Sequence, residues 1–168
     1  IGPWANGITQ CVLDSGFTAD GWYSFIEKHK ITVWYTAPTA IRAIMKEGEE
    51  VIKKHDLSSL RFLASIGEPL NAEAVLWSDK VFGMKFHDTY WQTETGSMVI
   101  SNYPCMKVKP GSMGKPFPGM EVGLVDIKTH EPFNKKGVVG VIAIKPGWPA
   151  MFRAYWNNKE NYDKKFVN

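Results

Sequence analysis

Apolar and polar positions follow two different periods over the first part of the chain. Thr18 is a candidate N-cap, and the residues behind it show the three-to-four-residue spacing of an amphipathic helix. The positions that carry this spacing are Trp22, Phe25, Ile26 and His29. A β-branched and aromatic run, 31–35, then predicts a short strand that ends before Pro38.

Two more helices are predicted downstream. The first has its apolar positions at Ile41, Ile44, Met45, Val51 and Ile52, with Gly48 as a possible interruption. The second can be capped by Asn71. Its apolar side is predicted at Ala72, Val75, Leu76 and Phe82.

Strands are predicted on either side of the second of these helices. Residues 61–66 form a buried run that Gly67 and Pro69 end, and residues 85–88 form the next. The order is therefore strand, helix, strand, helix, strand. Crossovers of this length join parallel strands through right-handed connections, so an α/β fold with a parallel sheet and flanking helices is expected.

The chain changes character after Tyr103. Pro and Gly recur through 110–119, and two short strand candidates follow at 121–125 and 138–144, with a polar turn region between them. This pattern is typical of a small antiparallel β region appended to the α/β part. Residues 151–155 are predicted to form a short helix.

Two parts of one domain are expected, an α/β part over 1–103 and a β-rich part over 104–168. The chain starts at Ile1 without a Met and stops at Asn168 while aromatic residues are still frequent, so we expect both ends to be cut from a longer protein. A length of 168 residues with 44% hydrophobic residues allows a sizeable core.

Composition narrows the function classes. The formal net charge of the chain is only +3, and the basic residues that cluster do so in short pairs, which argues against a nucleic-acid-binding face. No apolar run approaches the ~20 residues of a membrane span, so no membrane partner is expected. Cys11 and Cys105 match no metal spacing and are expected to be buried or partly buried free thiols in a reducing compartment, the cytoplasm.

Residues 88–96 are the richest candidate for chemistry. The run Asp-Thr-Tyr-Trp-Gln-Thr-Glu-Thr-Gly follows a predicted strand, and ligands of parallel sheets bind outside the carboxyl ends of strands. Thr93 and Thr95 can donate hydroxyl hydrogen bonds to phosphate oxygens, and Glu94 is an oxygen ligand of the kind Mg²⁺ prefers beside nucleotide phosphates. The alternative is a Thr-rich turn that ends at Gly96, with Glu94 as a surface acid.

The turn 65–69, Ser-Ile-Gly-Glu-Pro, follows the preceding strand. Gly67 lets the backbone approach a flat ring, and Pro69 stiffens the exit into the next helix. A plain strand-to-helix turn is the alternative. If the two strands are adjacent, this turn and the one at 88–96 open into one crevice.

Together these segments resemble a known family. "YTAPTAIRA" (35–43), "SIGEPLN" (65–71) and "DTYWQTETG" (88–96) closely resemble the acetyl-CoA synthetase branch of the adenylate-forming enzymes, and "GSMGKPFPG" (111–119) and "GWPAMFRAYW" (147–156) continue the likeness. Such enzymes join a carboxylate to ATP, giving acyl-AMP and pyrophosphate, and then transfer the acyl group to coenzyme A. The resemblance implies acetate, ATP and coenzyme A as substrates, with Mg²⁺.

The resemblance also assigns roles to single residues. Thr93 would bind the α-phosphate, Glu94 would help to hold Mg²⁺, and Asp88 is expected near the adenine amino group. The turn at 67–69 would line the adenine and ribose side. The nucleotide-binding set is then Gly67, Glu68, Pro69, Asp88, Thr89, Tyr90, Trp91, Gln92 and Thr93.

Trp91 is expected to close the acyl pocket, with Ile66 as a second wall. A large planar wall leaves room for a two- or three-carbon acid, whereas relatives that take longer acids have a small residue there. Many relatives have Trp where this chain has Tyr90, which changes little because both are aromatic.

Essential parts of such an enzyme are absent from this sequence by the same resemblance. Its phosphate loop would precede Ile1, and the Asp that holds the ribose hydroxyls and the mobile C-terminal domain would follow Asn168. We therefore expect the isolated chain to be inactive. The alternatives are a ligase for longer acids, an adenylation domain of peptide synthesis, or a non-catalytic nucleotide-binding module. No Gly-x-Gly-x-x-Gly follows a strand, which disfavours a dinucleotide fold.

Overall fold

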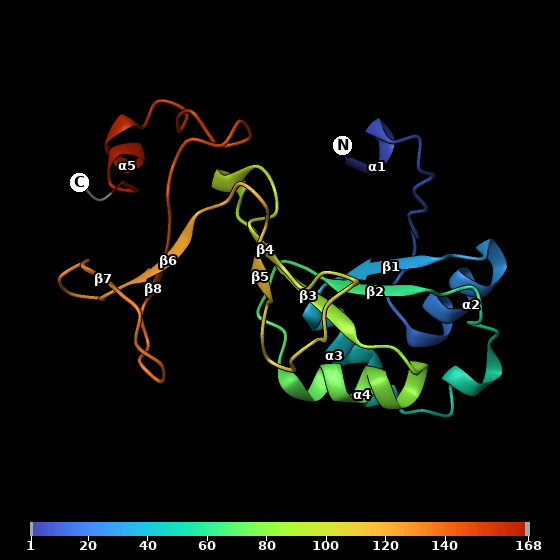
Figure 1. The fold of residues 1–168 in the computed structure, drawn as a ribbon. Helices are drawn as coiled ribbons and strands as arrows, with labels where there is room; N and C mark the ends of the chain where they lie inside the picture. The colour runs from blue at the N-terminus through green and yellow to red at the C-terminus, as the bar shows by residue number, and fades with distance from the viewer. Residues whose placement is uncertain (1, 167–168) are drawn as a thin grey trace.

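A computed structural model describes residues 2–166 (Figure 1). The chain begins with α1 (Gly2–Ala5), α2 (Ala19–His29), β1 (Val33–Thr36), α3 (Pro38–Glu47), the 3₁₀ turn η1 (Ile52–Lys54), β2 (Phe62–Ser65), α4 (Ala72–Phe82) and β3 (Phe86–Tyr90). It continues with the 3₁₀ turn η2 (Thr93–Thr95), β4 (Ile100–Ser101), β5 (Lys115–Pro116), β6 (Val122–Val125), β7 (Pro132–Phe133), β8 (Val141–Ile144) and α5 (Lys159–Asp163).

The first sheet has the order β1-β2-β3-β4-β5. Strands β1, β2 and β3 are parallel, whereas β4 and β5 add on in antiparallel fashion. A second sheet, β7-β6-β8, is antiparallel throughout and lies on the side of β4 and β5, away from α2 (Figure 1). The expected fold class, a parallel sheet with flanking helices followed by a small antiparallel region, is confirmed.

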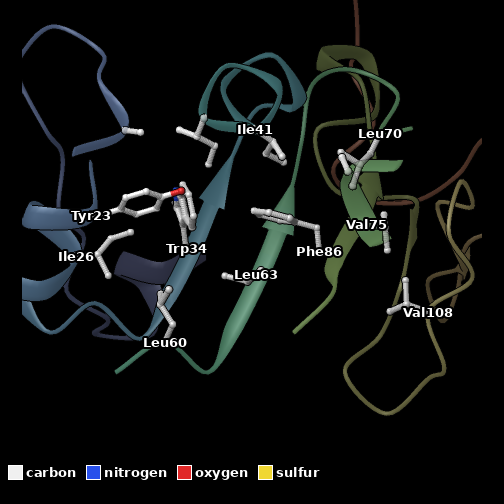
Figure 2. Close-up of a cluster of buried hydrophobic side chains, with 13 residues drawn as sticks. Tyr23, Ile26, Trp34, Ile41, Leu60, Leu63, Leu70, Val75, Phe86 and Val108 are labelled. Carbon is white, nitrogen blue, oxygen red and sulfur yellow. The ribbon is translucent and has the colours of Figure 1, made fainter. Parts of the chain in front are cut away.

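The main core lies on one face of the parallel strands (Figure 2). Trp34, Leu63 and Phe86 occupy this face of β1, β2 and β3 in register, and side chains of α2, α3 and α4 pack against them. Full burial of a residue such as Phe86, which is 0% exposed, contributes about 1.5–3 kcal/mol. The opposite face carries Val33 and Tyr35, which remain 42% and 41% exposed.

Helix boundaries follow local signals. Thr18 caps α2 as predicted, since its hydroxyl accepts a hydrogen bond from the backbone N–H of Gly21 at 3.1 Å. Helix α3 ends at Gly48, whose φ of 86° is outside the helical region. Val51 and Ile52 therefore lie beyond the helix to which their spacing had assigned them, although both still pack against the core.

The prediction of the apolar side of α4 is confirmed at two of its four positions. Val75 is buried and Phe82 packs against the core, but Ala72 and Leu76 face solvent, with Leu76 57% exposed. Ser78 takes a core position instead because its hydroxyl satisfies the backbone N–H of Phe86 at 3.0 Å. Asn71 precedes the helix but its side chain makes no capping hydrogen bond.

The helix predicted at 151–155 does not form. The backbone N–H of Phe152 donates to the carbonyl oxygen of Glu94 at 2.9 Å, so it is used by a distant turn rather than by a helix.

His55, which directly follows η1, contacts two carboxylates of α2. Its ring nitrogens lie 3.0 Å from Asp20 Oδ1 and 3.1 Å from Glu27 Oε2, and the His55 side chain is only 11% exposed. Burial lowers the pKa of His55, but hydrogen bonds to both carboxylates and their charges outweigh it, so the net pKa is raised.

Three further observations complete the fold. Cys11 and Cys105 are free, as expected, but exposed rather than buried. Within residues 2–166, no helix has the length and apolar character needed to cross a bilayer. Strand β5 pairs with β4, so the first sheet includes residues on both sides of position 103, where we expect the chain to change character. The two-part division remains a prediction.

Candidate functional site

Two turns leave the same edge of the first sheet. Strands β2 and β3 are adjacent and parallel, with Ser65 paired to Asp88. Because parallel strands end at one edge, the turn after β2 (66–70) and the turn after β3 (91–96) start side by side. Gly67 and Thr93 therefore follow neighbouring strands on one edge, as a shared cleft requires.

The turn after β2 is exposed and is tied to α3. Gly67 has a φ of 94°, and a Cβ there would meet nothing within 4 Å, so glycine is needed for the backbone conformation rather than for space. Thr39 donates to both carboxylate oxygens of Glu68, at 2.6 and 2.8 Å, and Arg42 donates at 2.6 Å. These contacts lower the pKa of Glu68, the hydrogen bond from Thr39 first. Pro69 is exposed beside them.

Asp88 lies in the middle of β3, on the face of the sheet that the helices cover. Its carboxylate is 8% exposed, accepts the Ser65 hydroxyl at 2.7 Å and accepts the Thr89 N–H at 3.0 Å. Burial raises the pKa of Asp88, while hydrogen bonds from Ser65 and from the backbone of Thr89 and Leu70 act in the opposite direction. The carboxyl is therefore engaged inside the protein.

Thr89 points to the opposite face of the sheet and is also buried. Its hydroxyl donates to the Ser65 carbonyl at 2.7 Å, and the Tyr35 hydroxyl lies 3.2 Å away. Its hydroxyl therefore ties the ends of β2 and β3 together. Burial raises the pKa of the Tyr35 phenol above its usual range.

The turn after β3 is built around η2. The Thr95 hydroxyl accepts the Gln92 N–H at 2.9 Å, and the Gln92 side chain in turn accepts a backbone N–H, which forms a capping box. Thr95 is 3% exposed and is a structural residue of the turn. Thr93 is exposed and Glu94 is half-buried, so the polar side chains of both residues lie near solvent.

A segment from the β-rich part, 148–155, braces this turn. The Trp148 indole donates to the Thr95 carbonyl at 2.7 Å, and the Tyr155 hydroxyl donates to Glu94 Oε1 at 2.5 Å. This hydroxyl is the first cause of the lowered pKa of Glu94. The brace was missed at the sequence level, where 147–156 contributed only to the family likeness.

Gly96 allows the brace to approach. It has a φ of 64°, and a Cβ added there would overlap the carbonyl group of Ala150. The glycine is required by both conformation and close contact.

The two expected walls of an acyl pocket leave the same edge. Ile66 directly follows β2 and is half-buried, and Trp91 directly follows β3 and is 39% exposed. Tyr90 is half-buried beside Trp91, and its pKa is raised by burial and then by the charge of Glu94.

Residues 2–166 contain no cluster of three or more His, Cys, Asp or Glu side chains able to hold a metal ion. The Glu94 carboxylate therefore has no such cluster around it, and a metal ion held there would take most of its ligands from elsewhere, as Mg²⁺ commonly does from substrate phosphates.

Known proteins match this chain over most of its length. A family model described as "AMP-binding enzyme" matches residues 1–156. Acetyl-coenzyme A synthetase of Bacillus subtilis (strain 168) is 49% identical over 167 residues, covering 98% of this chain and 28% of that protein. Acetyl-coenzyme A synthetase of Methanothrix soehngenii is 44% identical over 149 residues, covering 86% of this chain and 22% of that protein.

A solved structure matches as well. An acyl-CoA synthetase of Brucella canis superposes with a TM-score of 0.75 at 35% identity, covering 84% of this chain and 26% of that chain. This chain therefore spans only about a quarter of the length of these three proteins, from 22% of the Methanothrix soehngenii protein to 28% of the Bacillus subtilis protein.

Proposed function

The chain belongs to the AMP-binding enzyme family, and from this premise we propose that it is the central part of an acetate–CoA ligase. In the first reaction, an acetate oxygen attacks the α-phosphorus of ATP, forming acetyl-AMP and releasing pyrophosphate. In the second, the thiol of coenzyme A attacks the acetyl carbon, forming acetyl-CoA and releasing AMP. The named relatives, acetyl-coenzyme A synthetases up to 49% identical, support this choice.

Different site residues would contact different parts of the nucleotide. Gly67, Glu68 and Pro69 would line adenine and ribose, and Asp88 would sit at the adenine end. The rest of the run, Thr89, Tyr90, Trp91 and Gln92, would continue toward the phosphates. Thr93 would donate to the α-phosphate, and Glu94 would hold Mg²⁺, which supplies positive charge to the phosphate oxygens. Catalysis would rest on positioning and charge stabilisation, because the site offers donors and a metal ligand.

The acid specificity would come from shape. Trp91 and Ile66 start from neighbouring strand ends, and an indole across the pocket would exclude chains longer than two or three carbons. Exclusion of butyrate should be strong, whereas a single methylene discriminates by only ~1–3 kcal/mol, so preference over propionate should be modest. We place the enzyme in the cytoplasm, where free thiols persist.

The observation that carries the proposal is the common edge of β2 and β3, from which both turns start. The test is acetate-dependent exchange of labelled pyrophosphate into ATP by the full-length protein that contains this chain. Exchange with acetate and none with butyrate is expected, and Thr93→Ala should abolish most of it. The isolated chain should show none, because it covers only 28% of the Bacillus subtilis relative.

Two results would contradict the proposal. A full-length protein that binds ATP without exchange would be a nucleotide-binding module. Exchange that is faster with butyrate than with acetate would make it a ligase for longer acids.

A further inference from the structure

A buried polar cluster links the two turns of the site. Ser65, at the end of β2, is 0% exposed, and its hydroxyl donates to Asp88 Oδ1 at 2.7 Å. Thr89, the neighbour of Asp88, returns a hydrogen bond from its hydroxyl to the Ser65 carbonyl at 2.7 Å. The ends of β2 and β3 are thus joined by side chains on both faces of the sheet.

The polar groups of Asp88 are already used within the protein. Oδ1 accepts from the Ser65 hydroxyl and from the Thr89 N–H. The backbone carbonyl of Asp88 accepts from the N–H and the side-chain amide of Asn102, at 3.1 and 3.2 Å. Asp88 faces the same side of the sheet as Phe86, which is in the core. Oδ1 is therefore committed to donors within the protein, which favours a positioning role for the carboxyl.

Leu70 is the last residue of the turn that starts beside this cluster. It closes the turn after β2, is 4% exposed, and belongs to the core that α4 covers. The Asp88 carboxyl therefore holds Ser65, the residue from which the turn 66–70 starts. Leaving a charged group buried with one donor removed is costly, so these bonds are strongly coupled to the position of the turn.

We propose that Ser65 and Asp88 are positioning residues, which fix the turn 66–70 against β3 and act on adenine through Gly67 rather than through the carboxylate itself. This inference rests on the proposed function, because it explains how the adenine side of that site is built.

The test separates positioning from direct contact by using two nucleotides. The full-length protein is assayed for pyrophosphate release with ATP and with purine riboside triphosphate, which lacks the 6-amino group. If Ser65 acts through the turn, Ser65→Ala raises KM on the order of tenfold for both nucleotides and leaves KM for acetate unchanged. If the carboxylate binds the amino group directly, the loss is confined to ATP, and the inference is overturned.

Ser78→Ala is the matched control. Ser78 is also 0% exposed and lies under β3, but its hydroxyl bonds only to the backbone of Val75 and Phe86. It should reduce stability without changing either nucleotide KM. Ser65→Cys, which keeps a weak donor of similar size, should recover part of the loss and provides a folded variant if Ser65→Ala does not fold.

The outcomes separate the two proposals. A wild-type protein without acetate-dependent pyrophosphate release refutes the proposed function. An active wild-type protein whose Ser65→Ala and Ser65→Cys variants keep normal KM for both nucleotides refutes only the positioning role.

Discussion

Replacing Gly96 by Ala tests how tightly the brace 148–155 holds the turn after β3. The backbone of Gly96 has a φ of 64°, and an added methyl group would overlap the carbonyl of Ala150. Gly83, at the end of α4, has almost the same φ of 65°, but a Cβ there meets nothing within 4 Å. The pair therefore separates the conformational effect of losing glycine from the steric one.

The magnitudes follow from these two geometries. A left-handed conformation costs an L-residue about 1–2 kcal/mol, so Gly83→Ala should destabilise by roughly 1 kcal/mol after the gain from a less flexible unfolded chain. Gly96→Ala carries the same cost, and overpacking adds about 1–3 kcal/mol. Moving Ala150 away also weakens the bond from the Phe152 N–H to Glu94, typically worth about 0.5–1.5 kcal/mol. The excess of Gly96→Ala over Gly83→Ala should therefore be about 1–4 kcal/mol.

Thermal unfolding of this chain, followed by circular dichroism, measures the difference. An excess of about 2 kcal/mol corresponds to a Tm lower by roughly 4–8 °C than that of Gly83→Ala for a protein of this size. Equal Tm values for the two variants would show that the brace does not approach Gly96 as described, and the reasoning would be wrong.

Two further predictions concern acid specificity and pH. In the full-length protein, Trp91→Gly should shift kcat/KM from acetate toward longer acids by opening the pocket, and an unchanged chain-length profile would refute that role. Because the folded-state pKa of His55 is raised, its stabilisation should be complete below about pH 6.5 and fade as pH rises through the folded pKa. Urea unfolding should therefore give the wild type a higher free energy of unfolding than His55→Gln, by less than about 1 kcal/mol, and the difference should be larger at pH 6 than at pH 8. A difference that grows as the pH rises would contradict this prediction.

The parallel strands and their turns were predictable because their signals are local. Thr18 caps its helix, Gly48 ends one, and the runs that became β2 and β3 are bounded by Gly, Pro and polar residues. The family likeness added only the roles of residues within those turns. By contrast, β4, β5 and β7 have two residues each, which is too short for any periodic pattern.

Part of the site depends on contacts that sequence spacing cannot reveal. Tyr155 reaches Glu94 across 61 positions, along a path set by the whole β-rich part. The sequence did allow the side chain of Asp88 to be placed on the core face of the sheet. Asp88 lies two residues after Phe86, and alternate side chains of a strand share one face. The concentration of polar residues around it drew attention to ligands instead.

Strand β1 ends the first sheet, and this position has a consequence for handling the chain. Its outer backbone N–H and C=O groups have no neighbouring strand within residues 2–166, and it reads Val-Trp-Tyr-Thr without proline or charge. The opposite edge, β5, contains Pro116, which removes one donor. Unprotected edges recruit further strands, so preparations of this chain should aggregate through β1, and a lysine at Val33 should keep them dispersed.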